Sequence, residues 1–143
     1  MTRVGFYLSK ARDDSARLVL ACRIAEKAWR TGHKVYIHTA STEHSALCDR
    51  MLWTFRQGSF IPHALAEQDD GVSPVLIGHA PEPELRLHDV IINLSDEVPV
   101  FFGAFERLAE PVAGDDLQRQ QARERYRFYR DRGYALQTHE LDA

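Results

Sequence analysis

The feature that most restricts the fold of this chain is the run VIINL at residues 90–94, in which Asn93 is the only polar residue. A strand with one face in water alternates apolar and polar residues, whereas a strand covered on both faces is apolar almost throughout. Doubly covered strands of this kind belong to parallel sheets with helices on each side. The run therefore predicts a sheet that lies inside the molecule.

Strand and helix patterns alternate along the rest of the chain. Apolar residues recur at spacings of four, three and four from Leu18 to Trp29, which predicts a helix that Gly32 ends. A second helix is predicted over 46–53, and a last one from Asp115 or Asp116 to Arg132, before Gly133. The other predicted strands are 4–8, 35–37 and 74–77, with an edge strand or extended loop at 59–63, an ambiguous segment at 101–112 and a final extended segment at 134–138.

This order predicts an α/β fold with three layers, a mostly parallel sheet with helices on both faces, like a nucleotide-binding fold. A chain of 143 residues without repeats or linkers predicts one domain, 1–143. No apolar run approaches the ~20 residues that span a bilayer, and no signal core opens the chain, so we expect a cytoplasmic protein with no membrane partner. Cys22 and Cys48 are expected to be buried, reduced thiols.

Motifs for catalysis and for cofactors are missing. The loop after the first strand, residues 9–14, contains no glycine, so the fold would lack a phosphate-binding loop. The seven histidines show no metal-ligand spacing, and His88-Asp89 alone is too short a match to predict a metal site. No G-x-S-x-G elbow marks a nucleophile. We therefore expect no catalytic residue, no metal and no cofactor.

Positive charge is concentrated near the C-terminus. The whole chain carries a net charge of −3, which argues against a dedicated duplex-DNA binder. Residues 117–134, however, contain six arginines and two acids. Four of these arginines step by four, four and three along the predicted last helix, and their guanidinium groups should form one ridge beside Tyr126: Arg119, Arg123, Arg127 and Arg130.

Such a ridge suits an anionic partner, although a solvated helix face is the alternative. Arginine binds carboxylates with two hydrogen bonds and stacks on aromatic rings, so a terminal carboxylate with acidic neighbours would fit. Four apolar residues around the ridge are expected either to form a pocket for an aromatic anchor or to face the core: Val112, Tyr129, Tyr134 and Leu136.

A second candidate surface is aromatic. Trp53, Phe55 and Phe60 lie within eight residues, near a predicted helix end and an edge segment. They could present an apolar patch to a partner subunit, while core packing is the alternative for each of them.

Taken together, these residues resemble a known family, the chi subunit of bacterial DNA polymerase III. The R-E-R-Y block near the C-terminus, in order with the other stretches, makes the resemblance specific. The matching stretches are Phe6-Tyr7-Leu8, Leu52-Trp53, residues 59–63, Asn93-Leu94-Ser95, residues 122–127, Tyr129-Arg130 and Gly133-Tyr134.

The resemblance implies an accessory subunit of the clamp-loader assembly in DNA replication, without nucleotide and without catalysis of its own. In the family, one surface binds the acidic, phenylalanine-ending C-terminal tail of single-stranded-DNA-binding protein, and another binds the psi subunit. Carried over by position, the tail site comprises Arg123, Tyr126, Arg127 and Arg130, with Arg119, Val112, Leu136 and Thr138 at its margin, and the psi site includes Trp53 and Phe60.

One departure and several alternatives accompany this resemblance. The family has lysine at the position of Arg127, where arginine keeps the charge but changes the geometry. A helicase-like repair protein is an alternative partner for the psi-type surface. The ridge with Tyr126, Phe128 and Tyr129 could instead bind single-stranded nucleic acid directly, although we expect no tight nucleic-acid binding. Besides the adaptor and the nucleic-acid-binding module, a third possible function is that of an α/β hydrolase or nucleotide binder.

Overall fold

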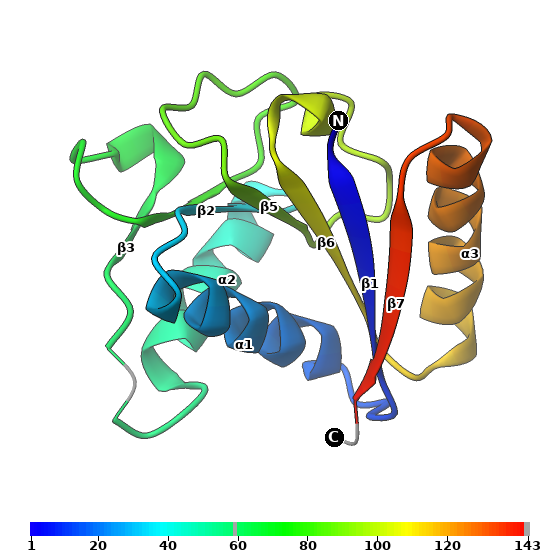
Figure 1. Cartoon of the computed structure of the whole chain (residues 1–143). Helices are drawn as coiled ribbons and strands as arrows, with labels where there is room; N and C mark the ends of the chain where they lie inside the picture. The colour runs from blue at the N-terminus through cyan, green and yellow to red at the C-terminus, as the bar shows by residue number, and fades with distance from the viewer. Residues whose placement is uncertain (59, 142–143) are drawn as a thin grey trace.

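The computed structural model describes residues 1–58 and 60–141, and within them it contains one sheet of seven strands (Figure 1). The strand order is β3-β4-β2-β5-β6-β1-β7, and every neighbouring pair is parallel. The strands are β1 Arg3–Ser9, β2 Val35–His38, β3 His63–Leu65, β4 Val75–Gly78, β5 Val90–Asn93, β6 Arg107–Val112 and β7 Leu136–Leu141; the helices are α1 Ala16–Arg30, α2 Thr42–Thr54 and α3 Asp116–Asp131, with short 3-10 turns η1 Ala66–Gln68 and η2 Phe102–Ala104.

Helices cover both faces of this sheet, as the sequence predicts. Alternate residues of the central strands, such as Ile37 and Ile92, pack with α1 and α2 on one face. Their neighbours Tyr36 and Ile91 pack on the other face, in the cluster that includes the buried side of α3 and the η2 segment. Figure 1 shows α1 and α2 on one side of the sheet, and α3 beyond β1 and β7 on the other. The α/β architecture and the buried VIINL strand are therefore confirmed.

Local signals place the ends of the first and last helices correctly. Gly32 follows α1 with φ +88°, and Gly133 follows α3 with φ +80°, in the left-handed region that glycine adopts without strain. The Asp115 side chain caps α3 by accepting a hydrogen bond from the Gln118 backbone N–H at 3.2 Å. The last helix ends at Asp131, one residue before the predicted end.

Four segments differ from their sequence-based descriptions. Helix α2 begins at Thr42, four residues before the predicted start. The edge strand after α2 begins at His63, later than the predicted segment 59–63, of which Ser59 lies outside the described residues. Segment 101–112 contains both alternatives, because η2 precedes β6. The final extended segment is a strand of the sheet and runs on to Leu141, since β1 offers it a parallel partner.

The two cysteines are buried free thiols, as expected, and lie on neighbouring helices. A hydrogen bond with Cys22 and burial raise the pKa of the Cys48 thiol. None of the helices in the described part of the chain is both long and apolar enough to cross a membrane.

Candidate functional site

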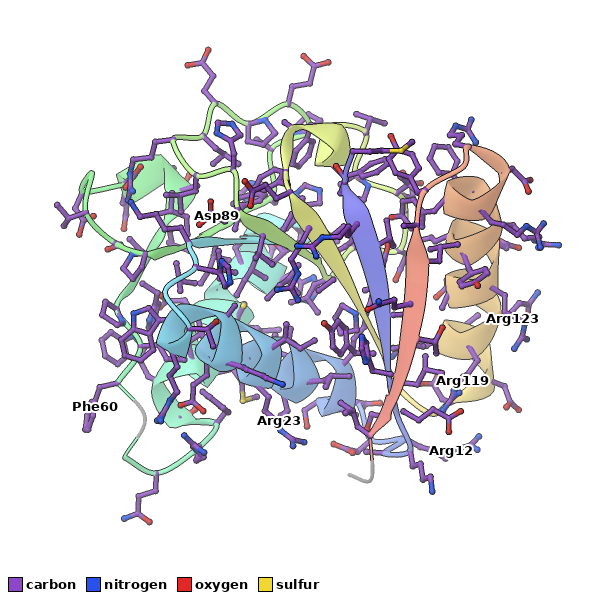
Figure 2. The ribbon with its side chains drawn as sticks, in the orientation of Figure 1. Arg12, Arg23, Phe60, Asp89, Arg119 and Arg123 are labelled. Atoms are coloured by element: carbon purple, nitrogen blue, oxygen red, sulfur yellow. The ribbon has the colours of Figure 1, made fainter. Side chains whose placement is uncertain are left out.

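The predicted arginine ridge lies on α3. Arg123, Arg127 and Arg130 are exposed, and Arg119 is half-buried. In Figure 2, Arg119 and Arg123 are labelled along α3, and Arg123 projects away from the sheet. The spacing of these residues places them along one side of the helix, where arginines four apart repel one another. This repulsion would be relieved by an anion bound along the ridge.

The four arginines differ in the partners that they already have. Arg119 donates a hydrogen bond from Nη2 to the backbone oxygen of Ser9 at 3.1 Å. Arg130 pairs with the neighbouring Asp131 at 3.1 Å. Among residues 1–58 and 60–141, no hydrogen bond or ion pair engages the guanidinium groups of Arg123 and Arg127. These two arginines are therefore the ones most available to an incoming carboxylate.

Apolar residues lie beside the two available arginines. Tyr126 is half-buried, and its ring centroid lies 5.3 Å from that of Phe6 on β1. Leu136 on β7 belongs to the same apolar cluster. Thr138 is the register partner of Phe6, and alternation along β7 turns its side chain to the same face of the sheet as Leu136. The structure thus brings Tyr126, Leu136 and Thr138 to one region between α3 and β7.

Two residues expected near an aromatic pocket face the core instead. Val112 is 1% exposed and Tyr129 is fully buried, so neither can touch a ligand without displacement of its neighbours. Of the two alternatives for these residues, the structure shows the core-facing one, because both pack on the α3 side of the sheet. The apolar surface left beside the ridge is formed by three half-buried residues, Tyr126, Tyr134 and Leu136.

Arg125, in the middle of the R-E-R-Y block, is part of a buried polar network. Its Nε donates to Glu110 Oε1 at 3.0 Å, and its Nη1 donates to the backbone oxygen of Asp96 at 3.1 Å. Glu110 also accepts from Tyr129 Oη at 2.7 Å and from Asn93 Nδ2 at 3.1 Å. Burial and the adjacent Glu110 carboxylate raise the pKa of Tyr129. This arginine therefore anchors α3 to the sheet and contributes no charge to the ridge.

The aromatic residues interleaved with the ridge offer little surface for stacking bases. Tyr129 is fully buried, and the guanidinium of Arg132 lies 3.6 Å from the centroid of the Phe128 ring. Only Tyr126 is left, and part of its ring packs on Phe6. Base stacking normally uses open aromatic faces, so the ridge is better suited to a carboxylate-bearing peptide than to single-stranded nucleic acid.

Two further cations, which the sequence did not assign to the ridge, lie near its first arginine. Lys10 and Arg12 are exposed residues of the loop that follows β1. The hydrogen bond from the Gly114 backbone N–H to the Ala11 oxygen, at 2.8 Å, joins this loop to the segment that precedes α3. Figure 2 shows Arg12 at the same end of the molecule as Arg119. More than 100 residues separate these positions in the sequence, so no local pattern could have connected them.

The second candidate surface is exposed at two of its three aromatic residues. The Trp53 side chain at the end of α2 is 57% exposed and Phe60 is 76% exposed, whereas Phe55 packs against the core between α1 and α2. Figure 2 shows Phe60 projecting into solvent at the opposite end of the molecule from α3. Two large exposed aromatic side chains are the kind of feature that marks a protein interface.

The ring of His63 packs against the ring of Trp53. Its ring centroid lies 4.6 Å from that of Trp53, and its side chain is buried. Both ring nitrogens face oxygen atoms, with Nδ1 2.7 Å from the Ile61 backbone oxygen and Nε2 3.2 Å from Asp49 Oδ1. The Ile61 contact is the better-formed one, because the Asp49 contact does not satisfy hydrogen-bond geometry. No local pattern indicates this role for His63, because histidine is also common in loops.

The carboxyl ends of β2 and β4, where doubly wound folds often bind nucleotides, carry a different kind of surface. A hollow of about 400 Å³ there is lined by two histidines and two carboxylates, among other residues: His38, His79, Asp96 and Glu97. Burial and the neighbouring His79 lower the pKa of His38 to about 4, so this ring is neutral at neutral pH. Carboxylates beside the neutral imidazole of His38 disfavour a phosphate group.

No group of three or more His, Cys, Asp or Glu side chains within residues 1–58 and 60–141 is arranged to hold a metal ion.

Comparison with known proteins gives a consistent result. Residues 1–137 match the family model described as DNA polymerase III chi subunit, HolC. The chain is 49% identical over 141 residues to the DNA polymerase III subunit chi of Pseudomonas aeruginosa, covering 99% of this chain and 98% of that protein. It is 35% identical over 120 residues to the chi subunits of Haemophilus influenzae and Escherichia coli, covering 83% of this chain in both cases and 83% and 82% of the relatives.

Proposed function

Because the chain belongs to the DNA polymerase III chi subunit family, as an accessory protein of DNA replication, we propose that it acts as a non-catalytic adaptor. In this proposal α3 binds the acidic C-terminal tail of single-stranded-DNA-binding protein. The exposed aromatic patch of Trp53 and Phe60 binds the psi subunit. The protein would thereby join the clamp-loader assembly to the coated template strand.

The observation that carries the tail proposal is the pair of unengaged guanidinium groups, Arg123 and Arg127, beside the ring of Tyr126. The tail's terminal carboxylate would accept charge-assisted hydrogen bonds from these arginines, and its last aromatic ring would pack on Tyr126 and Leu136. Upstream aspartates would follow the ridge toward Arg119 and the nearby cations Lys10 and Arg12. Arg130 would join the carboxylate by giving up its surface contact with Asp131, which costs little.

The expected affinity is modest. A hydrogen bond to a charged group contributes about 1.5–3 kcal/mol, less where water screens it. One or two such bonds and one packed ring therefore give a dissociation constant of about micromolar order. Because the attraction is between exposed charges, binding should weaken as the salt concentration rises.

The first prediction tests this site with Arg123→Ala. We expect the affinity for a tail peptide to fall about tenfold or more, because one charge-assisted contact is lost. The midpoint of thermal unfolding should hardly change, because Arg123 is exposed and its side chain makes no hydrogen bond or ion pair with the described residues. Isothermal titration with the labelled peptide and a thermal melt provide the two measurements.

Arg23→Ala is the matched control, because Arg23 is an exposed helical arginine on α1 and its loss changes the net charge equally. A tail peptide that bound Arg123→Ala as well as it binds the wild-type protein would refute the tail site. An equal loss in both variants would mean that the peptide responds only to overall charge.

The support for the psi site is the exposure of Trp53 and Phe60. An isolated apolar side chain on a surface needs no explanation, but two large aromatic rings near one helix end are typical of an interface that is buried in a complex. The rigid support of Trp53 by His63 fixes one of these rings before binding. A helicase-like repair protein that used the same patch would compete with psi.

The second prediction concerns Phe60→Ala. Removal of this ring should weaken psi association about tenfold or more, as for a central interface aromatic, and should leave tail binding and thermal stability unchanged. Co-purification with psi, the peptide titration and a thermal melt separate these effects. Phe55→Ala is a useful contrast, because Phe55 packs against the core and its loss should lower the melting temperature. Normal psi binding by Phe60→Ala would remove that residue from the interface.

A further inference from the structure

A hollow of about 560 Å³ lies between α1 and strands β6, β1 and β7, on the face of the sheet opposite α3. Its lining contains three basic side chains, Arg3, Lys27 and Arg107, and two histidines, His33 and His139. None of the side chains that line it is a carboxylate. In a chain with a net charge of −3, this local excess of positive charge calls for a physical reason.

Arg3 and Arg107 are the least expected members of this lining. They are register partners on the neighbouring strands β1 and β6, and both side chains line the hollow. Like charges directly opposite one another destabilise a sheet. Within residues 1–58 and 60–141, no hydrogen bond or ion pair engages either guanidinium. Asp89, immediately before β5, is close to Arg107 along the backbone, since its carbonyl oxygen accepts a hydrogen bond from the Arg107 N–H at 3.0 Å. Its carboxylate instead accepts a hydrogen bond from the Lys34 backbone N–H at 2.9 Å.

The floor of the hollow is made of small residues. Gly5 and Ala109 are register partners two residues further along β1 and β6, on the same face of the sheet as the two arginines. A Cβ atom at Gly5 would lie 3.3 Å from the ring of Tyr7, which stacks on His139 with a centroid distance of 4.7 Å. The ring of Tyr7 therefore lies over Gly5, and with His139 it forms an aromatic wall of the hollow that also contains the two arginines.

Positive charge continues from the hollow over the exposed side of α1. A second hollow of about 340 Å³ shares Lys27 and Thr31 with the first and adds Arg23, Arg30 and Arg56. Its one carboxylate, Glu26, pairs with Arg56 at 2.6 Å and with Arg30 at 3.7 Å. We call the six cations of the two hollows the basic track: Arg3, Arg23, Lys27, Arg30, Arg56 and Arg107.

Ordinary structural causes explain only part of this track. Lys27 and Arg30 lie in the last turn of α1, where cations complement the helix dipole. Arg30 and Arg56 also form ion pairs with Glu26. Arg3, Arg23 and Arg107 have neither role. An extended anion that passes from α1 into the hollow would explain all three.

We propose that the basic track binds the phosphodiester backbone of single-stranded nucleic acid. Regularly spaced negative charges match a line of cations, and a single strand can bend from α1 down to the floor at Gly5, whereas a duplex is stiff. The track and the α3 ridge lie on opposite faces of the sheet, so one molecule can hold a peptide tail and a strand at the same time. This inference is separate from the proposed function and uses none of its site residues.

Binding should be weak in isolation, which agrees with the net negative charge of the chain. A few phosphate contacts without base recognition give a dissociation constant of about 10⁻⁴–10⁻⁶ M at physiological salt. When the protein is bound to the tail of single-stranded-DNA-binding protein, it would nevertheless stay close to the strand that this protein covers. This proximity raises the effective concentration of the strand at the basic track.

The experiment measures the anisotropy of a labelled oligothymidine over a range of salt concentrations. Two double variants of equal net charge are compared, Arg3→Ala with Arg107→Ala, and Arg123→Ala with Arg127→Ala. We expect the first to weaken oligonucleotide binding about tenfold at low salt and to reduce the slope of log K against log salt by about 1.4, which is 0.7 for each lost phosphate contact. The second should bind the oligonucleotide like the wild-type protein.

Four outcomes would overturn the inference. The wild-type protein could fail to bind the oligonucleotide at low salt, the first variant could bind it normally, or the second could lose binding, which would move the site to α3. Displacement by inorganic phosphate at matched ionic strength would also overturn it, by showing a simple anion site. The first variant should melt no lower than the wild-type protein, because it removes a like-charge pair.

A tail peptide titrated into the same variants keeps the two proposals apart. The first variant should bind the peptide normally and the second should not. A failure of all peptide binding would refute the proposed function and leave the basic track untouched. A failure of oligonucleotide binding alone would refute the basic track and leave the tail site standing.

Discussion

Arg123 and Arg125 are separated by two positions on α3, and the turn of the helix gives them different surroundings. Arg123 faces water without a partner among the described residues, whereas Arg125 is 4% exposed and pairs with the fully buried Glu110. The desolvation of two charges is costly, so the pair depends on the additional donors Tyr129 and Asn93. At the residue scale, the same type of side chain is therefore exposed and open to a partner at one position, and holds the fold together at the other.

The third prediction follows for Arg125→Met. Loss of the guanidinium leaves the Glu110 carboxylate buried with neutral donors only, and we expect the free energy of unfolding to fall by about 3–5 kcal/mol. Urea denaturation measures this loss. Addition of Glu110→Gln should restore part of it, because the amide removes the buried charge and keeps an acceptor for Tyr129. Arg123→Met, the surface control, should cost less than about 0.5 kcal/mol.

At the scale of elements, the carboxyl end of β2 places a titratable group in the interior. His38 is 8% exposed, and its Nδ1 lies 3.2 Å from Tyr36 Oη. Burial and then the nearby His79 hold the pKa of His38 at about 4, below its ordinary value of 6.5. The hollow that it faces also carries Asp96 and Glu97, which would stabilise a charged ring, so burial outweighs their attraction.

The fourth prediction is the resulting pH dependence of stability. Because the folded state has the lower pKa, the unfolded chain binds a proton first as pH falls. The stability contribution of neutral His38 is complete above pH 6.5 and is lost between pH 6.5 and about 4. Between about pH 7.5 and 4.5 the wild-type protein should lose about 2–3 kcal/mol more than His38→Gln does. Urea titrations at both pH values measure the loss for each protein. If the wild-type protein and His38→Gln lost the same free energy of unfolding, the low pKa assigned to His38 would be contradicted.

At the scale of the whole molecule, the two candidate protein-binding surfaces lie at opposite ends of the sheet. Figure 2 shows Phe60 on one side, beyond the β3 edge, and Arg123 on the other, on α3 next to the β7 edge. The five remaining strands between these edges form a continuous, fully parallel sheet with buried central members. Such a rigid core keeps the two surfaces at a fixed separation.

The fifth prediction is that the two partners bind independently. A tail peptide should bind the complex with psi as tightly as it binds the free protein, because the two surfaces lie at opposite edges of the seven-stranded sheet. The double variant Arg123→Ala with Phe60→Ala should show the separate losses of each single variant, which add when sites are distant. Titration of the peptide with and without psi measures the coupling. A change of more than about threefold would show that the sites communicate.

Much of this molecule follows from local pattern. The VIINL run, the apolar spacing from Leu18 to Trp29, and the caps at Asp115, Gly32 and Gly133 specify strands and helices from neighbouring residues alone. The strongest site signal was also local, because the helical spacing of Arg119, Arg123, Arg127 and Arg130 is visible in the sequence. These features are determined by backbone geometry, which repeats over a few residues.

Tertiary structure decided which side chains are available. Glu110 withdraws Arg125 from the ridge, Val112 and Tyr129 enter the core, and Trp53 and Phe60 stay exposed while Phe55 packs inward. It also brings Arg3 beside Arg107 across 104 positions of sequence, so that a basic hollow exists at all. Burial, pairing and concavity depend on contacts between distant segments, and the local periodicity of a sequence carries no information about which distant segments will meet.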